Sequence, residues 1–371
     1  MNPNRLLNLF CELVCIESPS RHEAPMAVRC ADELRELGFD IHFDASAAQT
    51  GSDTGNLIAH LPGTAPGSII LSAHMDTVYP CAGIEPVVVE GIVRSAGDTI
   101  LSADDKAGVA AILEGVRATL ETSELRPDIT VLLTTCEELH LLGSGALETE
   151  KLPAGAPCYV LDADGAPGTV ITGAPRHWAM RASFAGRAAH AGVVPEEGIS
   201  TIQMAAAAIA AMPLGRIDEA TTANIGIIKG GNATNVVPDS CMVEGECRSL
   251  FVDRAEAQKA AMTEALEAAA ARFGGTVQIE WTMSYDAILF DEDDPFVQRI
   301  AHAAQTAGLE ARFQHSGGGS DANMLTTHGV RAITLGVGME DYHSTSEHIA
   351  VADLEASARL VEALIAEEVK G

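Results

Sequence analysis

Imidazole and carboxylate side chains recur along the chain where predicted strands end or a predicted helix begins. They are His74, Asp104, Glu137, Glu138, Asp162 and His343. Two imidazoles with several carboxylates form a mixed nitrogen and oxygen ligand set that suits zinc, cobalt or manganese. Carboxylates gathered at one place repel one another and do not all stay ionised unless cations compensate them. These residue types therefore predict a site for divalent metal ions.

The first of these positions lies in the segment SIILSAHMD, residues 68–76. Its apolar, β-branched run predicts a buried strand that ends just before His74. Two residues apart on extended backbone, His74 and Asp76 point to the same side, so both can address one ion or one water. A His-x-Asp triplet alone is a weak signal, because a loop histidine beside a capping aspartate has the same letters.

The number of carboxylates also predicts a type of reaction. Two ions about 3.5–4 Å apart, bridged by one carboxylate, are the usual arrangement for metal-assisted hydrolysis. A spare carboxylate then accepts the proton of the attacking water. Glu137 and Glu138 are adjacent, so their side chains diverge, and one can bind metal while the other acts as the base.

Buried strands that alternate with helices are predicted on either side of these positions. The predicted strands are 56–61, 69–73, 129–134, 158–161 and 331–337, and the predicted helices are 23–37, 104–120, 295–307 and 351–369. This alternation indicates an α/β fold with a mostly parallel sheet. In such sheets ligand sites lie at the carboxyl ends of the strands, where the metal-binding candidates fall.

The pattern changes between residues 177 and 286, where strand, helix, two strands, helix and strand follow one another. This order predicts an inserted α+β domain of ferredoxin-like type. We therefore expect a catalytic domain made of residues 1–176 and 287–371, with the insert at 177–286.

The composition of the chain argues against some classes of binding partner and indicates a cellular compartment. The 371 residues suit two domains, and the net charge of −29 argues against nucleic acid and anionic membranes, which need basic patches. No run approaches the roughly 18 apolar residues of a membrane span. The eight cysteines are scattered without a Cys-x-x-Cys pair and no secretory signal is evident, so we expect reduced thiols in a cytoplasmic protein. Cys81 and Cys136 are thus expected to be buried thiols, not nucleophiles.

Eight segments, in order along the chain, resemble those of the dinuclear zinc exopeptidase and aminoacylase family, most closely its tripeptidase T branch. They are SAHMDTVYP (72–80), LSADDKAG (101–108), TTCEELHLLGS (134–144), YVLDADG (159–165), GRAAHAGVVPEEGIS (186–200), GGNATNVVPDS (230–240), GGGSDAN (317–323) and YHSTSE (342–347). Each is modest alone, but together they span nearly the whole chain.

The resemblance implies a role for each residue of the metal site. The implied ligands are His74 and Asp162 for one ion, Glu138 and His343 for the other, and Asp104 as the bridge. Asp76 would orient the first histidine, as carboxylates behind metal ligands do. Glu137 would be the general base.

Neighbouring residues of the same types compete for some of these roles. Asp105 competes with Asp104 for the bridging position, although the family pattern favours the latter. Asp164 competes with Asp162. Further histidines near His343, none of which directly follows the predicted strand, are His315, His328 and His348.

Further residues resemble positions that contact substrate in the family. The segment of His190 implies a histidine that stabilises the oxyanion of the scissile carbonyl, often from a partner subunit. Asn235 and Arg248 resemble residues that hold the ends of the substrate, and a guanidinium suits a bidentate grip on a carboxylate. Gly318 and Gly319 would let the backbone approach the substrate closely.

The resemblance implies a metal-dependent exopeptidase that cleaves short peptides, with two divalent ions, zinc or else cobalt or manganese. Members with Asp at the position of Asp162 resemble aminopeptidases, and those with Glu resemble carboxypeptidases and N-deacylases. We therefore expect a tripeptide aminopeptidase. The alternatives are a metallocarboxypeptidase or N-acyl amino-acid amidohydrolase and, from another class, an inactive peptide-binding homologue, which would have lost a ligand or base position. The insert would act as a lid and dimerisation domain, although members of this branch can be monomeric.

Overall fold

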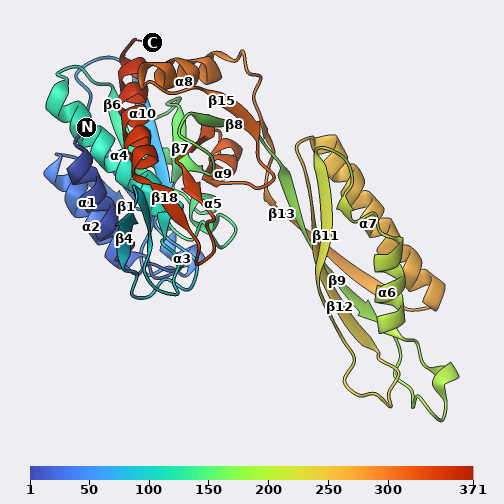
Figure 1. Cartoon of the computed structure of the whole chain (residues 1–371). Helices are drawn as coiled ribbons and strands as arrows, with labels where there is room; N and C mark the ends of the chain where they lie inside the picture. The colour runs from blue at the N-terminus through green and yellow to red at the C-terminus, as the bar shows by residue number, and fades with distance from the viewer. Residues whose placement is uncertain (371) are drawn as a thin grey trace. The chain divides into compact units, whose positions relative to one another are not determined.

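The computed structural model of the chain describes residues 1–370 (Figure 1). They form two compact units. The first contains residues 1–172, 290–315 and from 320 onward, and the second contains residues 173–289 and 316–319. Each unit has a hydrophobic core of its own.

The central sheet has nine strands, in the order β1-β2-β6-β3-β7-β16-β8-β14, with β15 paired to β8. The strands are β1 (Asp40–Phe43), β2 (Leu57–Leu61), β3 (Ser68–His74), β6 (Asp128–Thr134), β7 (Cys158–Ala163), β8 (Thr169–Ala174), β14 (Ile288–Leu289), β15 (Arg312–His315) and β16 (Ala332–Gly336). The central strands β6, β3, β7 and β16 are parallel, and the pairs β1-β2, β2-β6, β16-β8 and β8-β14 are antiparallel. The predicted α/β fold with a mostly parallel central sheet is confirmed.

Helices surround these strands in the first unit. They are α1 (Pro3–Val14), α2 (Ala24–Glu36), α3 (Ala47–Thr50), α4 (Ala103–Thr122), α5 (Leu142–Gly145), α8 (Pro295–Thr306), α9 (Asp321–Thr327) and α10 (Val351–Lys370), with the short 3-10 helix η1 (Thr149–Lys151). The long helix α4 packs on β3 and β7 and is covered in turn by α1 and α10. Because β3 is buried from Ile69 to His74, its sequence is mostly apolar instead of alternating, with Ser72 and His74 as its buried polar residues.

A second, smaller sheet in the first unit was not predicted from the sequence. Its order is β17-β18-β5-β4, and its strands are β4 (Pro86–Val89), β5 (Ile92–Ser95), β17 (Met339–Glu340) and β18 (His348–Ala350). The segment that carries His343 is the connection between β17 and β18. This sheet therefore anchors that segment at both ends.

The second unit is built on a five-stranded antiparallel sheet, in the order β10-β11-β12-β9-β13. Its elements are β9 (Arg176–Ala185), η2 (Pro195–Glu197), α6 (Thr201–Ala211), β10 (Gly215–Arg216), β11 (Thr221–Gly230), β12 (Ser240–Ser249), α7 (Val252–Phe273) and β13 (Thr276–Tyr285). Apart from the two-residue β10, this is the predicted order of strand, helix, two strands, helix and strand. Figure 1 shows α6 and α7 together beside the sheet, where Met204, Met262 and Leu266 pack against Val243.

Two observations concern the whole of the described chain. Across residues 1–370, no helix combines the length and the apolar character needed to cross a membrane. All eight cysteines lie within these residues, and each is a free thiol.

Candidate metal centre and active site

Neighbouring parallel strands bring most of the candidate metal ligands to one edge of the sheet. His74 is the last residue of β3, and Asp162 lies near the end of β7. Glu137 and Glu138 follow β6, and Asp104 lies in the first turn of α4. Since β6, β3 and β7 are adjacent and parallel, their carboxyl ends meet at this edge.

The carboxylate of Asp104 lies between the two histidines. Its Oδ1 is 3.0 Å from Nε2 of His74, and its Oδ2 is 3.1 Å from Nε2 of His343. Beyond them, Asp162 Oδ1 is 3.5 Å from Nε2 of His74, and Glu138 Oε1 is 2.8 Å from Nε2 of His343. The donors thus form two halves, each with one imidazole and one carboxylate, that share Asp104.

Asp105, which competes with Asp104 as the bridge, is also close to this centre. Ligand atoms of His74, Asp104 and Glu138 lie within 4.8 Å of one another, and so do those of His74, Asp105 and Asp162. Both oxygens of Asp105 are already engaged, however, because Oδ2 accepts the N–H of His74 and Oδ1 that of Gly108, each at 3.1 Å. This arrangement favours Asp104 as the bridge, with Asp105 supporting the backbone.

The remaining competing residues lie outside the cluster. Asp164 and His315 are exposed. His328 bonds to the carbonyl of Ser144, at 3.1 Å from Nε2, and His348 to that of Ser346, at 2.9 Å from Nδ1. His74 and His343, by contrast, contact carboxylates of the cluster directly.

Burial and the neighbouring charges in this cluster shift the pKa values of its side chains strongly. Burial raises the pKa of Glu137 well above its ordinary value, and the charge of Asp162 adds to the effect. Burial likewise raises the pKa of Asp162 to about 7. Burial opposes ionisation of Asp104 too, but hydrogen bonds from His343 and His74 outweigh it and lower the pKa of Asp104. Hydrogen bonds to Asp104 and Glu138 raise the pKa of His343 to about 10.

Carboxylates this close repel one another, and the two imidazoles can contribute at most one positive charge each. Divalent cations require the same atoms in their unprotonated form, imidazole nitrogen and carboxylate oxygen. The donor set therefore fits metal ions, and its nitrogen and oxygen atoms suit zinc, cobalt or manganese.

The main-chain carbonyl of Asp76 determines which nitrogen of His74 faces the cluster. It lies 3.0 Å from Nδ1. Because a carbonyl can only accept, Nδ1 carries the proton and Nε2 presents its lone pair to a metal. The carboxylate of Asp76 is further from this ring, with Oδ1 3.5 Å from Nδ1.

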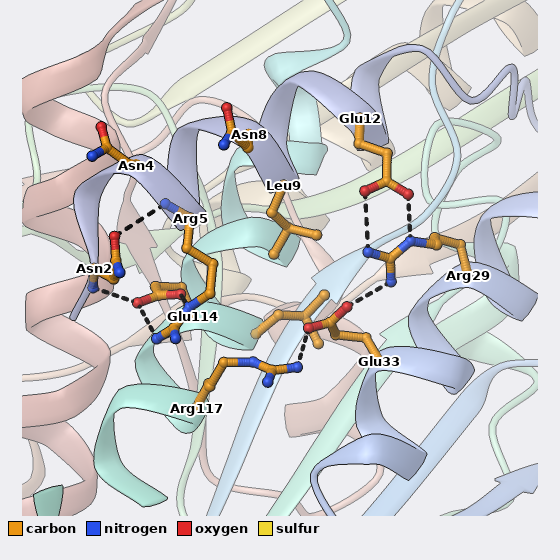
Figure 2. Close-up of a pocket in the computed structure, with 11 residues that line it drawn as sticks. Asn2, Asn4, Arg5, Asn8, Leu9, Glu12, Arg29, Glu33, Glu114 and Arg117 are labelled. Atoms are coloured by element: carbon orange, nitrogen blue, oxygen red, sulfur yellow. Dashed lines mark hydrogen bonds and ion pairs between the residues drawn. The ribbon is translucent and has the colours of Figure 1, made fainter. Parts of the chain in front are cut away.

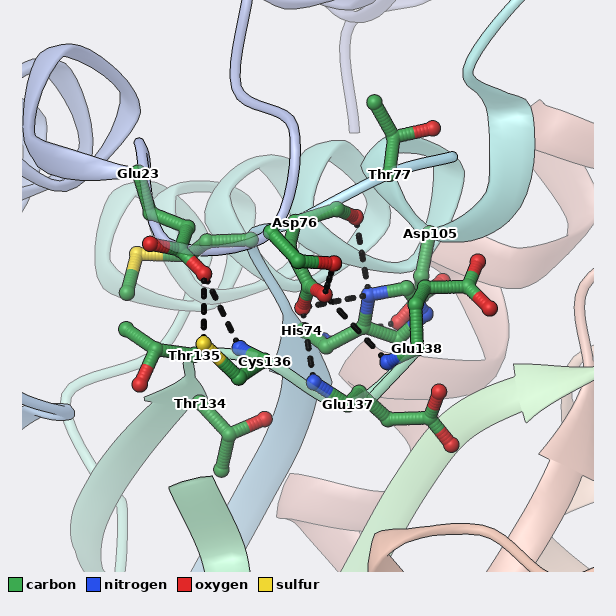
Figure 3. Close-up of polar contacts among 12 residues, drawn as sticks. Glu23, His74, Asp76, Thr77, Asp105, Thr134, Thr135, Cys136, Glu137 and Glu138 are labelled. Atoms are coloured by element: carbon green, nitrogen blue, oxygen red, sulfur yellow. Dashed lines mark hydrogen bonds and ion pairs between the residues drawn. The ribbon is translucent and has the colours of Figure 1, made fainter. Parts of the chain in front are cut away.

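The carboxylate of Asp76 holds the loop that follows β6 (Figure 3). Its Oδ1 accepts the N–H of Glu137 at 2.9 Å and its Oδ2 that of Glu138 at 3.2 Å. Oδ2 also accepts the hydroxyl of Ser20 at 2.7 Å. Asp76 is fully buried, so these are strong charge-assisted bonds. Asp76 thereby links the strand that carries His74 to both glutamates.

Glu137 and Glu138 use their side chains differently. Glu138 contacts His343, whereas no hydrogen-bond donor among residues 1–370 lies within bonding distance of the Glu137 carboxylate. An uncommitted carboxylate with a raised pKa is suited to accept and return a proton.

Further buried polar side chains support this loop, and sequence reasoning missed them. Glu23 accepts the N–H of Cys136 at 3.0 Å, and Asn56 accepts that of Thr135 at 3.0 Å. Asp321 accepts the hydroxyl of Ser144 at 2.5 Å, and also that of Thr134. In the sequence, Asn56 and Asp321 are marked only as polar residues beside apolar or glycine-rich segments, and Glu23 is not marked at all, so the sequence does not say what they contact.

Left-handed backbone conformations occur beside several ligands. Ser102 has φ 64°, Cys136 has φ 51° and His343 has φ 60°. Such conformations are unfavourable for residues other than glycine and persist where surrounding contacts enforce them, often at functional sites. In the same region, position 108 has no room for a side chain, because a Cβ on Gly108 would lie 2.1 Å from the carbonyl oxygen of Leu161.

His190 and Asn235 belong to the second unit, where two loops bring them together. The N–H of Ala191 donates to the carbonyl of Asn235 at 3.0 Å, and His190 forms a β-bridge with Val236. The neighbouring Val193 is 69% exposed, so these loops present a surface of the unit.

Arg248 and the glycines 317–319 also meet in the second unit. Arg248 donates from Nε and Nη2 to the carboxylate of Glu246, at 3.0 and 2.8 Å. The side of the guanidinium that can bind a carboxylate with two hydrogen bonds is therefore already occupied. Its Nη1 is 3.4 Å from the carbonyl of Gly317. At Gly319 a Cβ would lie 2.4 Å from the ring of Tyr285, so this glycine is needed for packing, whereas at Gly318 the nearest atom is 3.8 Å away.

Comparison with known proteins gives the family. Residues 70–367 match the family model of Peptidase family M20/M25/M40. The crystal structure of aminopeptidase PepT from Bacillus cereus ATCC 10987 is 42% identical, with a TM-score of 0.93. That of a tripeptidase from Staphylococcus aureus subsp. aureus Mu50 is 36% identical, with a TM-score of 0.95. Uncharacterized protein YqjE of Bacillus subtilis (strain 168) is 42% identical over 371 residues, and 100% of both chains is covered in all three cases.

The family match extends over most of the chain and includes every candidate metal ligand. It confirms the family resemblance and the hydrolase class predicted from the sequence. This chain belongs to Peptidase family M20/M25/M40.

Proposed function

We propose that the protein is an aminopeptidase of short peptides, with tripeptides as its substrates, and that it works with two divalent metal ions, zinc in the first instance. The observation that carries the proposal is the arrangement of Asp104, which offers one oxygen to each of two imidazoles. His74 with Asp162 would hold one ion, and His343 with Glu138 the other. The similarity to an aminopeptidase and a tripeptidase supports the substrate class.

When bound, the ions would supply Lewis-acid polarisation of the scissile carbonyl and make the attacking water more acidic. Glu137 would accept the proton of that water on its carboxylate and return it to the nitrogen of the leaving amine. Its carboxylate has no competing hydrogen-bond donor among residues 1–370, and its buried position gives it the raised pKa that this exchange requires.

Three residues of the second unit have proposed roles in the same reaction. His190 would donate a hydrogen bond to the developing oxyanion of the substrate, which is a large contribution to catalysis when the donor is already in place. Asn235, whose loop bonds to the loop of His190, would contact the substrate beside it. Arg248 would bind an end of the peptide through Nη1 alone, because its Nε and Nη2 already donate to Glu246.

The remaining features of the second unit stay predictions. Its role as a lid and dimerisation domain accords with its separate core and with the part of β11 beyond its short pairing with β10, where Ile227 and Ile228 are 40% and 50% exposed. Light scattering of the purified protein would establish whether it is a dimer.

The specificity can be tested with two peptides, Ala-Ala-Phe and its N-acetyl derivative. An aminopeptidase should release Ala and Ala-Phe from the free peptide only, and only after zinc or cobalt is restored to metal-stripped protein. Release of Phe, or cleavage of the acetylated peptide, would instead identify a carboxypeptidase or an N-acyl amino-acid amidohydrolase. If metal-loaded protein cleaves neither peptide, the proposal is refuted.

A further inference from the structure

Glu347 lies beneath the metal centre and makes an unusual set of contacts. It is 1% exposed, and its carboxylate accepts three backbone hydrogen bonds from one short segment. Oε2 accepts the N–H groups of Leu101 and Ser102, both at 2.7 Å, and Oε1 accepts that of Asp104 at 2.9 Å. One carboxylate therefore fixes the backbone that leads into the candidate bridging residue.

This segment needs an acceptor from elsewhere. It precedes the regular part of α4, because Asp104 and Asp105 have non-helical backbone dihedral angles, so its N–H groups need acceptors from outside the helix. Ser102 occupies the N-cap position, but its left-handed conformation leaves its side chain without a capping hydrogen bond. Glu347, distant in sequence, supplies the missing acceptor.

The same carboxylate belongs to the segment that carries His343. Glu347 follows that histidine by four residues, and its own N–H donates to the carbonyl of Ser344 at 3.1 Å. Strands β17 and β18 hold this connection at both ends. A rigid link therefore runs from the backbone of His343, through Glu347, to the backbone of Asp104.

We propose that Glu347 is a positioning residue that sets His343 against Asp104 and so builds the second half of the metal centre. The inference rests on the proposed function, because it assumes two ions that share Asp104. The first half is secured differently, since Asp105 accepts the N–H of His74 at 3.1 Å. Loss of Glu347 should therefore weaken the ion held by His343 and Glu138 more than the ion held by His74 and Asp162.

Glu347→Gln tests this asymmetry. The amide replaces one carboxylate oxygen with an NH₂ group, which donates and cannot accept. If the NH₂ group replaces Oε1, the hydrogen bond from Asp104 is lost, and if it replaces Oε2, those from Leu101 and Ser102 are lost. Co²⁺ would be titrated into metal-stripped protein by calorimetry, and the bound ions counted by elemental analysis. We expect the first ion to bind as in the wild type and the Kd of the second to rise about 10–100-fold.

The matched control is Glu114→Gln. Glu114 is also 1% exposed and lies on α4, where it accepts the N–H of Asn2 at 2.6 Å and pairs with Arg5. It lines a separate cavity of about 440 Å³ (Figure 2), none of whose lining residues is a candidate metal ligand. This variant should bind both ions with wild-type affinity, whatever its effect on stability.

Several results would overturn the inference. One is a second-ion Kd in Glu347→Gln equal to that of the wild type, and another is an equal loss of both ions. If circular dichroism shows that this variant is unfolded, Glu347→Asp, which keeps the charge but is one methylene shorter, should show the same selective loss. Unfolding of both variants would show that the carboxylate serves the fold itself. Wild-type protein that binds two ions but cleaves no peptide would refute the proposed function and leave this inference standing.

Discussion

Replacing Asp76 with Asn should show how strongly one buried carboxylate holds the catalytic loop. The substitution keeps the shape of the side chain but turns one oxygen into an N–H donor. That oxygen now accepts the N–H of either Glu137 or Glu138, so one of these bonds is lost whichever way the amide is oriented. Ser20 can rotate its hydroxyl and accept a hydrogen bond instead, so its contact survives.

The cost follows from the type of bond. A hydrogen bond to a charged group contributes about 1.5–3 kcal/mol, and the surviving bond weakens by about 1 kcal/mol when its acceptor becomes neutral. We therefore expect the free energy of unfolding of zinc-loaded Asp76→Asn to fall by about 2–4 kcal/mol. In metal-free protein the loss should be smaller, because removing one negative charge also relieves repulsion with Asp321.

Urea denaturation followed by far-ultraviolet circular dichroism, with saturating zinc and with a chelator, measures both values. Turnover should fall about 10–100-fold, as is typical when the groups behind a metal site are changed. Ser20→Ala is the control, because it removes only the hydroxyl bond, at a cost at the lower end of the same range of about 1.5–3 kcal/mol, and leaves both backbone bonds in place. The reasoning is refuted if zinc-loaded Asp76→Asn matches the wild type, or if Ser20→Ala has the same effects on stability and turnover.

Three further predictions follow from the described contacts. Glu137→Gln should lower kcat about 10²–10⁴-fold while both ions stay bound, as measured by turnover and elemental analysis; loss of an ion would show that Glu137 is a ligand. Chelation should lower the free energy of unfolding by about 4 kcal/mol for each ion whose free concentration had been 1,000 times its Kd, and an unchanged urea midpoint would contradict a metal site. Hydrogen bonds from His177 and Arg248 lower the pKa of Glu246 from 4.5 to about 2, so its stabilisation is present above pH 4.5 and is lost as the pH falls towards 2. Glu246→Gln should flatten this acid dependence in unfolding followed by tryptophan fluorescence, since both tryptophans lie in the second unit, and an unchanged acid profile would argue against the linkage.

The parts of the site that follow strand ends could be predicted from the sequence. Parallel strands have continuous apolar sequences, so the polar residue that interrupts each run is conspicuous, as His74 and Asp162 are. Topology then brings these residues together without knowledge of loop conformation. The predicted order of elements in the insert likewise depends only on local periodicity.

Contacts between loops could not be predicted in this way. The small sheet that anchors His343 is made of strands of two to four residues, too short for a periodic signal. The contact of Glu347 with Asp104 joins segments far apart in sequence. Gly319 shows the same difficulty, because its sequence suggested room for substrate, whereas the ring of Tyr285 fills the space beside it.

The carboxylates of this centre differ in what their oxygens face, and that difference separates their roles. Asp76 and Glu347 accept backbone N–H groups with both oxygens, so their charge is compensated by the fold and they have little left for a cation. Asp104 and Glu138 instead face imidazole nitrogens that are themselves metal ligands, and without cations their charge is balanced only by protons on those rings. Backbone conformation, set in part by residues such as Ser102 with its left-handed φ, decides which carboxylate meets which partner. The acidic residues that hold the loops in place are thus a precondition for those that would bind metal, because only a rigid backbone can keep uncompensated charges close together before the ions arrive.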